Sequence, residues 1–164
     1  MQDDEKNNKE THSPPPLQHR IAPGEVWRRP AQRILFLDFD GVLHPGDAGT
    51  FRYVAKLEKL LRQYPVVDLV ISSNWRERVP FRELIDPFSV DVAQRIVGTT
   101  PILPGEDRQS EIETFCRRHG IQDWLVLDDR AELFSPYYWR LQLIDGRLGL
   151  CDTDLDLVEH WLRR

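Results

Sequence analysis

Acidic or hydroxyl side chains follow three apolar segments of the chain, at the point where each segment ends. Asp38 and Asp40 follow residues 34–37, Ser72 and Ser73 follow residues 66–71, and Asp128 and Asp129 follow residues 124–127. Short apolar runs of this kind are typical of strands buried on both faces of a parallel sheet. Because parallel strands end at one edge, we expect these side chains to gather where open α/β sheets bind their ligands.

The four aspartates predict a metal site. Two carboxylates about 4 Å apart repel each other by roughly 4 kcal/mol at an effective dielectric constant near 20, so a cluster of them needs a cation. Oxygen ligands without His or Cys select a hard ion, and a site with room for water and phosphate suits Mg²⁺ better than Ca²⁺. We therefore expect Mg²⁺ as the cofactor, with Asp38, Asp40, Asp128 and Asp129 as the residues that hold it.

The hydroxyl and basic residues predict a phosphate site beside the metal. Ser72 and Ser73 offer hydrogen-bond donors, and Arg108, at the entrance of a predicted helix, adds positive charge. Each feature has an ordinary alternative, because Asp-x-Asp-Gly can be a simple turn and serines often cap helices. The combination at successive strand ends favours phosphoryl chemistry.

The remaining sequence supplies the elements that position these residues. Apolar spacing predicts helices over 51–64 and 109–119, the second ending at Gly120, a weaker helical piece near 81–85, and further strands near 95–97 and 141–144. Thr153 and Asp156 resemble a capping box that opens a last helix, expected to bury Leu157, Val158, Trp161 and Leu162. The alternation implies an α/β fold, a three-layer sandwich around a mostly parallel, Rossmann-like sheet.

Length and composition indicate one domain preceded by a tail. Residues 1–32 are polar and proline-broken, which predicts a mostly disordered tail before a domain at 33–164, with Trp27 either docking the end of the tail on the domain or lying exposed. The tail lacks the apolar stretch of a secretory signal, and no later segment reaches membrane-span length. Two distant cysteines favour a reducing, cytoplasmic setting, and the net charge of −5 provides no general attraction to nucleic acid.

Over about residues 33–143 these motifs resemble those of the haloacid dehalogenase (HAD) superfamily, with motif I at Asp38 to Val42, motif II at Ser72, motif III at Arg108 and motif IV at Asp128-Asp129. The resemblance implies that Asp38 is the nucleophile that takes up the phosphoryl group. It implies that Asp40 is the general acid and base, with its backbone carbonyl on the metal. Asp128 would be a further metal ligand, and Asp129 would hold a metal-bound water or orient its neighbours.

In the same resemblance Ser72 and Arg108 would grip the phosphoryl oxygens. The superfamily usually has Lys at motif III, so Arg108 is a departure, with Arg117 or Arg118 as less favoured substitutes. The acid at Asp40 resembles phosphatases and phosphomutases rather than the ATPases or dehalogenases of the superfamily. The short spacing between motifs leaves no room for a cap domain, which implies an open site, as in relatives that act on proteins or polynucleotides.

A looser resemblance links the chain to small, capless bacterial members related to the phosphatase-like domains of RNA-repair proteins. It involves residues 72–76, residues 96–101 and Arg108-x-x-Glu111-Ile112. Trp75 and Arg76 would then be substrate contacts, one stacking on a base and the other binding a second phosphate. The alternative is a Trp that covers the core and an Arg that is solvated or paired with Glu77 or Asp91. His44 could reach a leaving group or could be a turn residue.

Three functions remain open at this point. The first is a Mg²⁺-dependent phosphomonoester hydrolase that works through an aspartyl-phosphate, with a polynucleotide end or a phosphoprotein as substrate. The second is a phosphotransferase or mutase that uses the same intermediate, and the third is a non-catalytic binding module on the HAD scaffold. The expected partner is a phosphorylated substrate, with no membrane and no obligate protein partner.

Overall fold

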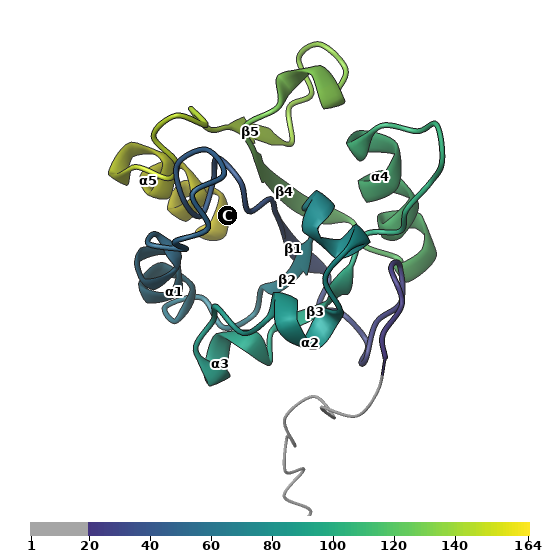
Figure 1. The fold of residues 1–164 in the computed structure, drawn as a ribbon. Coiled ribbons are helices and arrows are strands. Elements are labelled where there is room, and N and C mark those ends of the chain that lie inside the picture. The colour runs from purple at the N-terminus through teal and green to yellow at the C-terminus, as the bar shows by residue number, and fades with distance from the viewer. Residues whose placement is uncertain (1–19) are drawn as a thin grey trace, which may run out of the picture.

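The protein was analysed as a computed structural model that describes residues 20–164 (Figure 1). Its sheet has five strands in the order β3-β2-β1-β4-β5, and all the pairs are parallel. The strands are β1 (Arg33–Leu37), β2 (Asp68–Ile71), β3 (Ile96–Thr99), β4 (Asp123–Asp128) and β5 (Leu141–Leu143). The helices are α1 (Val54–Leu61), α2 (Phe81–Leu84), α3 (Val90–Ala93), α4 (Arg108–His119) and α5 (Asp152–Leu162), with 3₁₀ turns η1 (Asn74–Glu77) and η2 (Ala131–Leu133).

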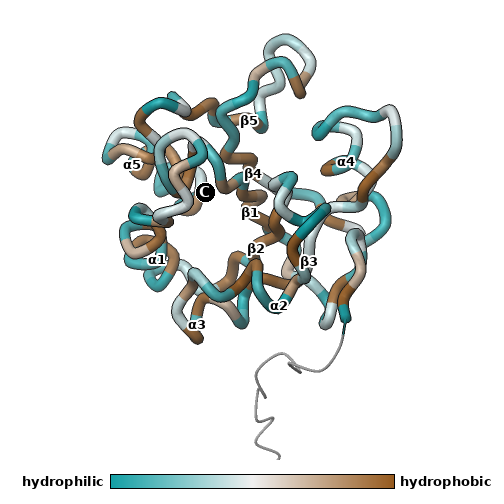
Figure 2. The backbone as a smooth tube through the Cα atoms, viewed as in Figure 1, coloured by the Kyte–Doolittle hydropathy of each residue, from teal (hydrophilic) through white to brown (hydrophobic). Residues whose placement is uncertain are grey.

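Helices cover both faces of the sheet, because the side chains of the central strand alternate between them. Leu35 and Leu37 belong to the core formed with α1 and α5, whereas Ile34 and Phe36 pack with residues of α4. Figure 2 shows the apolar strands at the centre of the molecule. The predicted three-layer α/β sandwich with a parallel, Rossmann-like sheet is therefore confirmed.

The order of the strands creates a crevice between β1 and β4. From β1 the chain proceeds outward through β2 and β3, then returns to the other side of β1 to form β4 and β5. The carboxyl ends of β1 and β4 lie side by side, since Leu37 pairs with Leu127. Such a reversal of strand order is where open α/β sheets bind ligands.

The boundary predicted after residue 32 does not hold for the last part of the tail, where Trp27 docks on the domain, one of the two alternatives for this residue. Val26 pairs antiparallel with Gly98, and the Trp27 indole N–H donates to the Ile96 carbonyl at 2.9 Å, so this segment covers the outer edge of β3. Backbone pairing of this kind needs no hydrophobic pattern, which is why the polar composition was misleading. The rest of the predicted tail, residues 1–19, lies outside the described residues.

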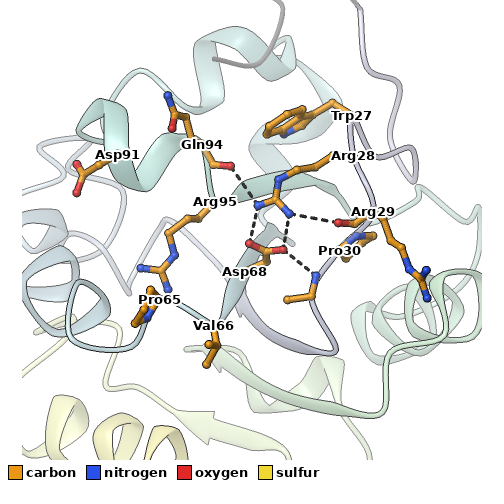
Figure 3. A pocket seen from close by; sticks show the side chains of 11 residues that line it. Trp27, Arg28, Arg29, Pro30, Pro65, Val66, Asp68, Asp91, Gln94 and Arg95 are labelled. Atoms are coloured by element: carbon orange, nitrogen blue, oxygen red, sulfur yellow. Dashed lines mark hydrogen bonds and ion pairs between the residues drawn. The ribbon is translucent and has the colours of Figure 1, made fainter. Parts of the chain in front are cut away.

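An ion pair anchors this segment at the amino end of β2 (Figure 3). Arg28 binds both carboxylate oxygens of Asp68 at 2.6 and 2.7 Å, and the Ala31 N–H donates to the same carboxylate at 2.8 Å. The surrounding pocket therefore lies at the opposite end of β2 from Ser72. Its buried charges already have protein partners, so it is not the site that the sequence predicts.

The last helix differs from its prediction at the amino end. Cys151 is the N-cap and Asp154 closes the capping box, so α5 begins before Thr153, and Leu157 is 55% exposed. Val158, Trp161 and Leu162 are buried as expected. Within residues 20–164 only the 3₁₀ turn η1, the short helices α2 and α3 and their connections lie between β2 and β3, which leaves no cap domain there. No helix in that range is both long and apolar enough to cross a membrane.

Candidate active site

Asp38 and Asp40 lie just beyond β1, in different surroundings. Asp38 continues the ladder, since its N–H donates to the Leu127 carbonyl at 3.1 Å, and its side chain is only 6% exposed. The side chain of Asp40 is 42% exposed. A buried carboxylate in the crevice and a more accessible one beside it are suited to different chemical tasks.

The ends of β1 and β4 bring three carboxylates together. Asp38, Asp128 and Asp129 each offer an oxygen, and these oxygens all lie within 4.8 Å of one another. The carboxylate of Asp40 is not part of this group, because it binds His44 and Trp75. Any contribution of Asp40 to a metal is therefore expected from its backbone carbonyl.

Two glycines make room for Asp129. A Cβ atom on Gly41 or on Gly146 would lie 2.2 Å from Asp129 Oδ2, which is far inside van der Waals contact. Gly41 also has a φ of 72°, a left-handed conformation that favours glycine. The glycine after Asp40 is thus required both by the turn and by the close approach of Asp129.

Arg108 connects the nucleophile candidate to the end of β4. It is the first residue of α4, and its Nη1 lies 2.9 Å from Asp38 Oδ2 and 2.5 Å from Asp128 Oδ2. Nη2 donates to Asn74 Oδ1 at 2.9 Å. The alternatives Arg117 and Arg118 lie in the last turn of α4, at the other end of the helix. The geometry therefore favours Arg108 as the residue in the motif III position.

The charges of this cluster are only partly balanced. Burial raises the pKa of Asp128 to about 6, although Arg108 opposes the shift. Burial and then the charge of Asp38 raise the pKa of Asp129. Burial lowers the pKa of Arg108, but the charges of Asp38 and Asp128 outweigh this effect and raise it overall. Three carboxylates with one guanidinium leave an excess of negative charge that a divalent cation would neutralise.

The donor set fits Mg²⁺. It consists of oxygen ligands, the preferred ligands of a hard ion, and it is exposed on the side of Asp129, which is intermediate in burial. Asp38 Oδ1 accepts the Phe39 N–H and Asp128 Oδ1 accepts the Arg130 N–H, which orients both carboxylates. Asp38, Asp128 and Asp129 are therefore the side chains that would hold the ion.

Addition of Mg²⁺ is expected to raise the melting temperature. At a concentration about 100 times its Kd the ion would stabilise the folded state by about 2.7 kcal/mol, or roughly 5–10 °C for a domain of this size. The shift should be smaller near pH 5 than near pH 7.5, because the raised pKa of Asp128 lets protons compete with the metal as the pH falls. Thermal denaturation with and without EDTA measures this.

The matched substitutions are Asp128→Asn and Asp156→Asn, since Asp156 is an exposed aspartate of α5. The first should abolish the Mg²⁺-dependent shift and the second should preserve it. Equal shifts in both variants would show that the ion binds elsewhere.

Ser72 presents a buried hydroxyl to the same edge of the sheet. It follows β2 directly, and its N–H donates to the Leu37 carbonyl at 2.9 Å. Its Oγ is buried and has no hydrogen-bond partner among the described residues. Leaving such a group unpaired costs about 1–3 kcal/mol, which an oxygen of a bound phosphoryl group would recover.

Ser73 and Asn74 have structural roles at the same strand end. Ser73 Oγ accepts the Trp75 N–H at 3.3 Å and caps η1, so the alternative of serine capping holds for Ser73. A phosphate contact by Ser73 stays a prediction. Asn74, which binds Arg108, lies within residues 72–76 that the sequence analysis singled out, but no role was assigned to it there. Its position directly after the two serines was the available signal.

Arg76 is not placed to contact a substrate, contrary to the sequence prediction. Its side chain is 1% exposed, and all five of its N–H donors are used within the protein. The acceptors are the carbonyls of Ser72, Ser73, Thr100 and Pro101 and the carboxylate of Glu111. The alternatives of solvation or pairing with Glu77 or Asp91 were wrong as well. Arg76 ties the ends of β2 and β3 to α4.

Trp75 also has a position different from the base-stacking prediction. Its ring packs against Phe39 and Phe51, with centroid distances of 5.7 and 5.3 Å, and its indole N–H donates to Asp40 Oδ2 at 3.1 Å. The aromatic face is therefore part of a protein cluster. The interaction with Asp40 connects Trp75 to the site through a side chain rather than through the substrate.

Arg76→Ala is expected to destabilise the protein by about 3–5 kcal/mol, because it leaves the buried carboxylate of Glu111 and several carbonyls without their donor. Chemical denaturation measures the loss. The control is Arg78→Ala, an exposed arginine two residues away, which should change stability by less than about 0.5 kcal/mol. A stable Arg76→Ala protein with impaired activity would restore the substrate-contact hypothesis.

Comparison with known proteins assigns the chain to a family. The family model described as "HAD domain in Swiss Army Knife RNA repair proteins" matches residues 34–155, well over half of the chain. The chain belongs to this HAD family. Comparisons with curated proteins and with solved structures yielded no match.

Membership confirms the resemblance drawn from the motifs, including its link to RNA-repair proteins. The matched region begins inside β1 and ends inside α5, so it contains Asp38, Ser72, Arg108 and Asp128. At the level of the superfamily, the match supports a phosphatase-type enzyme. The five-stranded parallel sheet is the expected HAD-like architecture.

Proposed function

We propose that this protein is a Mg²⁺-dependent phosphomonoester hydrolase in which Asp38 is transiently phosphorylated. The observation that carries the proposal is the position of the buried Asp38 carboxylate, 2.9 Å from Arg108 and clustered with Asp128 and Asp129. In this proposal Asp38 is the nucleophile, Arg108 supplies a fixed positive charge, and the clustered carboxylates bind the metal at the carboxyl edge of the sheet. The family to which the chain belongs supports phosphatase chemistry of this kind.

In the first step an oxygen of Asp38 attacks the phosphorus and the bond to the leaving-group oxygen breaks. Asp40, the more exposed carboxyl group, gives its proton to that oxygen. Arg108 and the unpaired hydroxyl of Ser72 donate to the phosphoryl oxygens. When bound, Mg²⁺ neutralises part of the negative charge that the phosphoryl group brings to three carboxylates.

In the second step a water molecule attacks the phosphorus of the aspartyl-phosphate. Asp40, now ionised, accepts the proton of the water, the bond between phosphorus and Asp38 breaks, and inorganic phosphate leaves. Asp40 ends protonated and Asp38 ends as a free carboxylate, so both are ready for another cycle.

An open site suggests that the substrate is a polymer. In residues 20–164 the loop 46–50, which follows motif I, is short and exposed, and a loop of this length cannot enclose a small ester. Binding energy must then come from contacts beyond the phosphate. Because the matching family is named for RNA-repair proteins, we propose a phosphorylated polynucleotide end as the substrate.

The test is a phosphatase screen with Mg²⁺ over end-phosphorylated oligonucleotides, phosphopeptides, mononucleotides, sugar phosphates and p-nitrophenyl phosphate. We expect kcat/KM for the oligonucleotide end to exceed that for p-nitrophenyl phosphate by about 100-fold, which corresponds to about 2.7 kcal/mol of transition-state binding. A mononucleotide or sugar phosphate as best substrate would contradict the polymer. Absence of release from every ester would contradict hydrolysis.

A further inference from the structure

Protein donors hold both oxygens of the Asp40 carboxylate. His44 Nε2 lies 2.7 Å from Oδ1, and the Trp75 indole N–H donates to Oδ2 at 3.1 Å. His44 is fully buried, whereas the side chain of Asp40 is 42% exposed. The two protein donors thus fix the carboxyl group on its buried side, while its exposed side retains lone pairs that a substrate can reach.

The buried ring of His44 acts as a hydrogen-bond donor. While Asp40 is ionised its carboxylate can only accept, so in that part of the cycle the hydrogen of this contact is on Nε2. Nδ1 is buried and has no partner within residues 20–164. The ring therefore directs its Nε2 hydrogen at Asp40.

The donors themselves are held by an aromatic cluster. The Phe51 ring packs edge-on against His44 and Trp75, with centroid distances of 4.8 and 5.3 Å. Phe51 has a φ of 51°, a left-handed conformation that costs a non-glycine residue about 1–2 kcal/mol. Packing in this cluster must offset that strain. The cluster therefore restricts the rotation of both donors.

We propose that His44 is a positioning residue that holds the Asp40 carboxyl group in the orientation for proton transfer. The inference rests on the proposed function, in which Asp40 protonates the leaving group. Within residues 20–164 no covering domain restricts this side chain, so a buried donor has to fix it. Small misplacements of a reacting group can reduce a rate by about 10²-fold, which sets the scale of the expected effect.

The test compares His44→Phe with His44→Gln on two esters. Phe fills the aromatic cluster without a donor, and the amide of Gln can place an N–H near the position of Nε2. Alkyl phosphates need a proton on the departing oxygen, whereas p-nitrophenolate leaves readily without one. The quantity measured is kcat/KM, because it reports the step in which the leaving group departs.

For His44→Phe we expect kcat/KM to fall roughly 30-fold with the alkyl ester, and the loss with p-nitrophenyl phosphate to be at least ten times smaller. His44→Gln should recover most of the loss with the alkyl ester. Trp75→Phe, which removes the other donor but retains a ring, should show the same discrimination between esters. The control is His119→Phe, which removes a histidine hydrogen bond to the Gly24 carbonyl at the far end of α4.

His119→Phe should not discriminate between the esters. Equal losses of kcat/KM on both esters in His44→Phe would overturn the inference and leave His44 a purely structural residue. Full activity of that variant would also overturn the inference. Wild-type protein that releases phosphate from no ester of the screen, the oligonucleotide end included, would instead contradict the proposed function, and the positioning role with it. The ratio between esters in an active protein is therefore what separates the two proposals.

Discussion

Asp38→Asn is expected to abolish turnover, with a loss of at least roughly 10⁴-fold, the scale seen when a catalytic nucleophile is removed. The amide matches the carboxylate in volume but cannot form the acyl-phosphate. We do not expect the substitution to impair folding, because the amide oxygen can still accept from the Phe39 N–H or face Arg108. Far-ultraviolet circular dichroism and the melting temperature should remain close to those of wild type.

Two measurements make this result specific. Borohydride reduction during turnover should convert a phosphorylated aspartate to homoserine at position 38 in the wild type, and not in the variant. Asp47→Asn in the exposed loop 46–50 is the matched substitution and should remain active. A variant at Asp38 that retains more than a few per cent of the wild-type rate would contradict its assignment as the nucleophile.

Asp40→Asn should reduce kcat with an alkyl phosphate by roughly 10²- to 10⁴-fold, the usual range for a general acid or base. The carboxyl group of Asp40 is not one of the three that form the cluster of Asp38, Asp128 and Asp129, so the variant should still bind Mg²⁺ with a normal thermal shift. Its amide oxygen can still accept from His44 or from Trp75. The loss of activity would thus come from the absence of a proton donor at position 40 and not from weaker binding of Mg²⁺.

The leaving group provides the check on this role. With p-nitrophenyl phosphate, kcat/KM of Asp40→Asn should fall much less than with the alkyl ester, because the departing phenolate needs no proton. Pre-steady-state measurements should then show a burst of nitrophenol, since hydrolysis of the intermediate still requires the base. An unchanged rate with the alkyl ester would remove Asp40 from the mechanism.

Features close together in the sequence were predictable without a structure. The apolar runs before Asp38, Ser72 and Asp128 specify strands because a buried strand needs apolar side chains on both faces, and this is a local pattern. Gly120 was recognisable as the end of α4 for the same reason, since its φ of 67° belongs to the residue itself. With the strands came the expectation that their ends share one edge.

The membership of the metal cluster was only partly predictable. That carboxylates gather at the edge followed from the alternation of strand and helix, but the strand order that places β4 next to β1 did not. Asp129 enters through space left by Gly146, which is 17 residues further along the chain and carried no local signal. The Asp40 side chain binds His44 and Trp75 instead, and the pattern of apolar and polar residues could not predict these contacts.

Side-chain environments were decided by the tertiary structure. Arg76 follows Ser72 and Ser73 closely in the sequence, which suggested a position at the edge of the site. In the structure it is enclosed by Thr100, Pro101 and Glu111, which lie 24–35 residues further along the chain. Arg is normally exposed, and only a full set of acceptors makes its burial tolerable. The sequence by itself therefore determined which residues stand at the strand ends. Which of them face a substrate and which support its neighbours depended on contacts between distant segments, because burial and hydrogen-bond partners are properties of the packed chain.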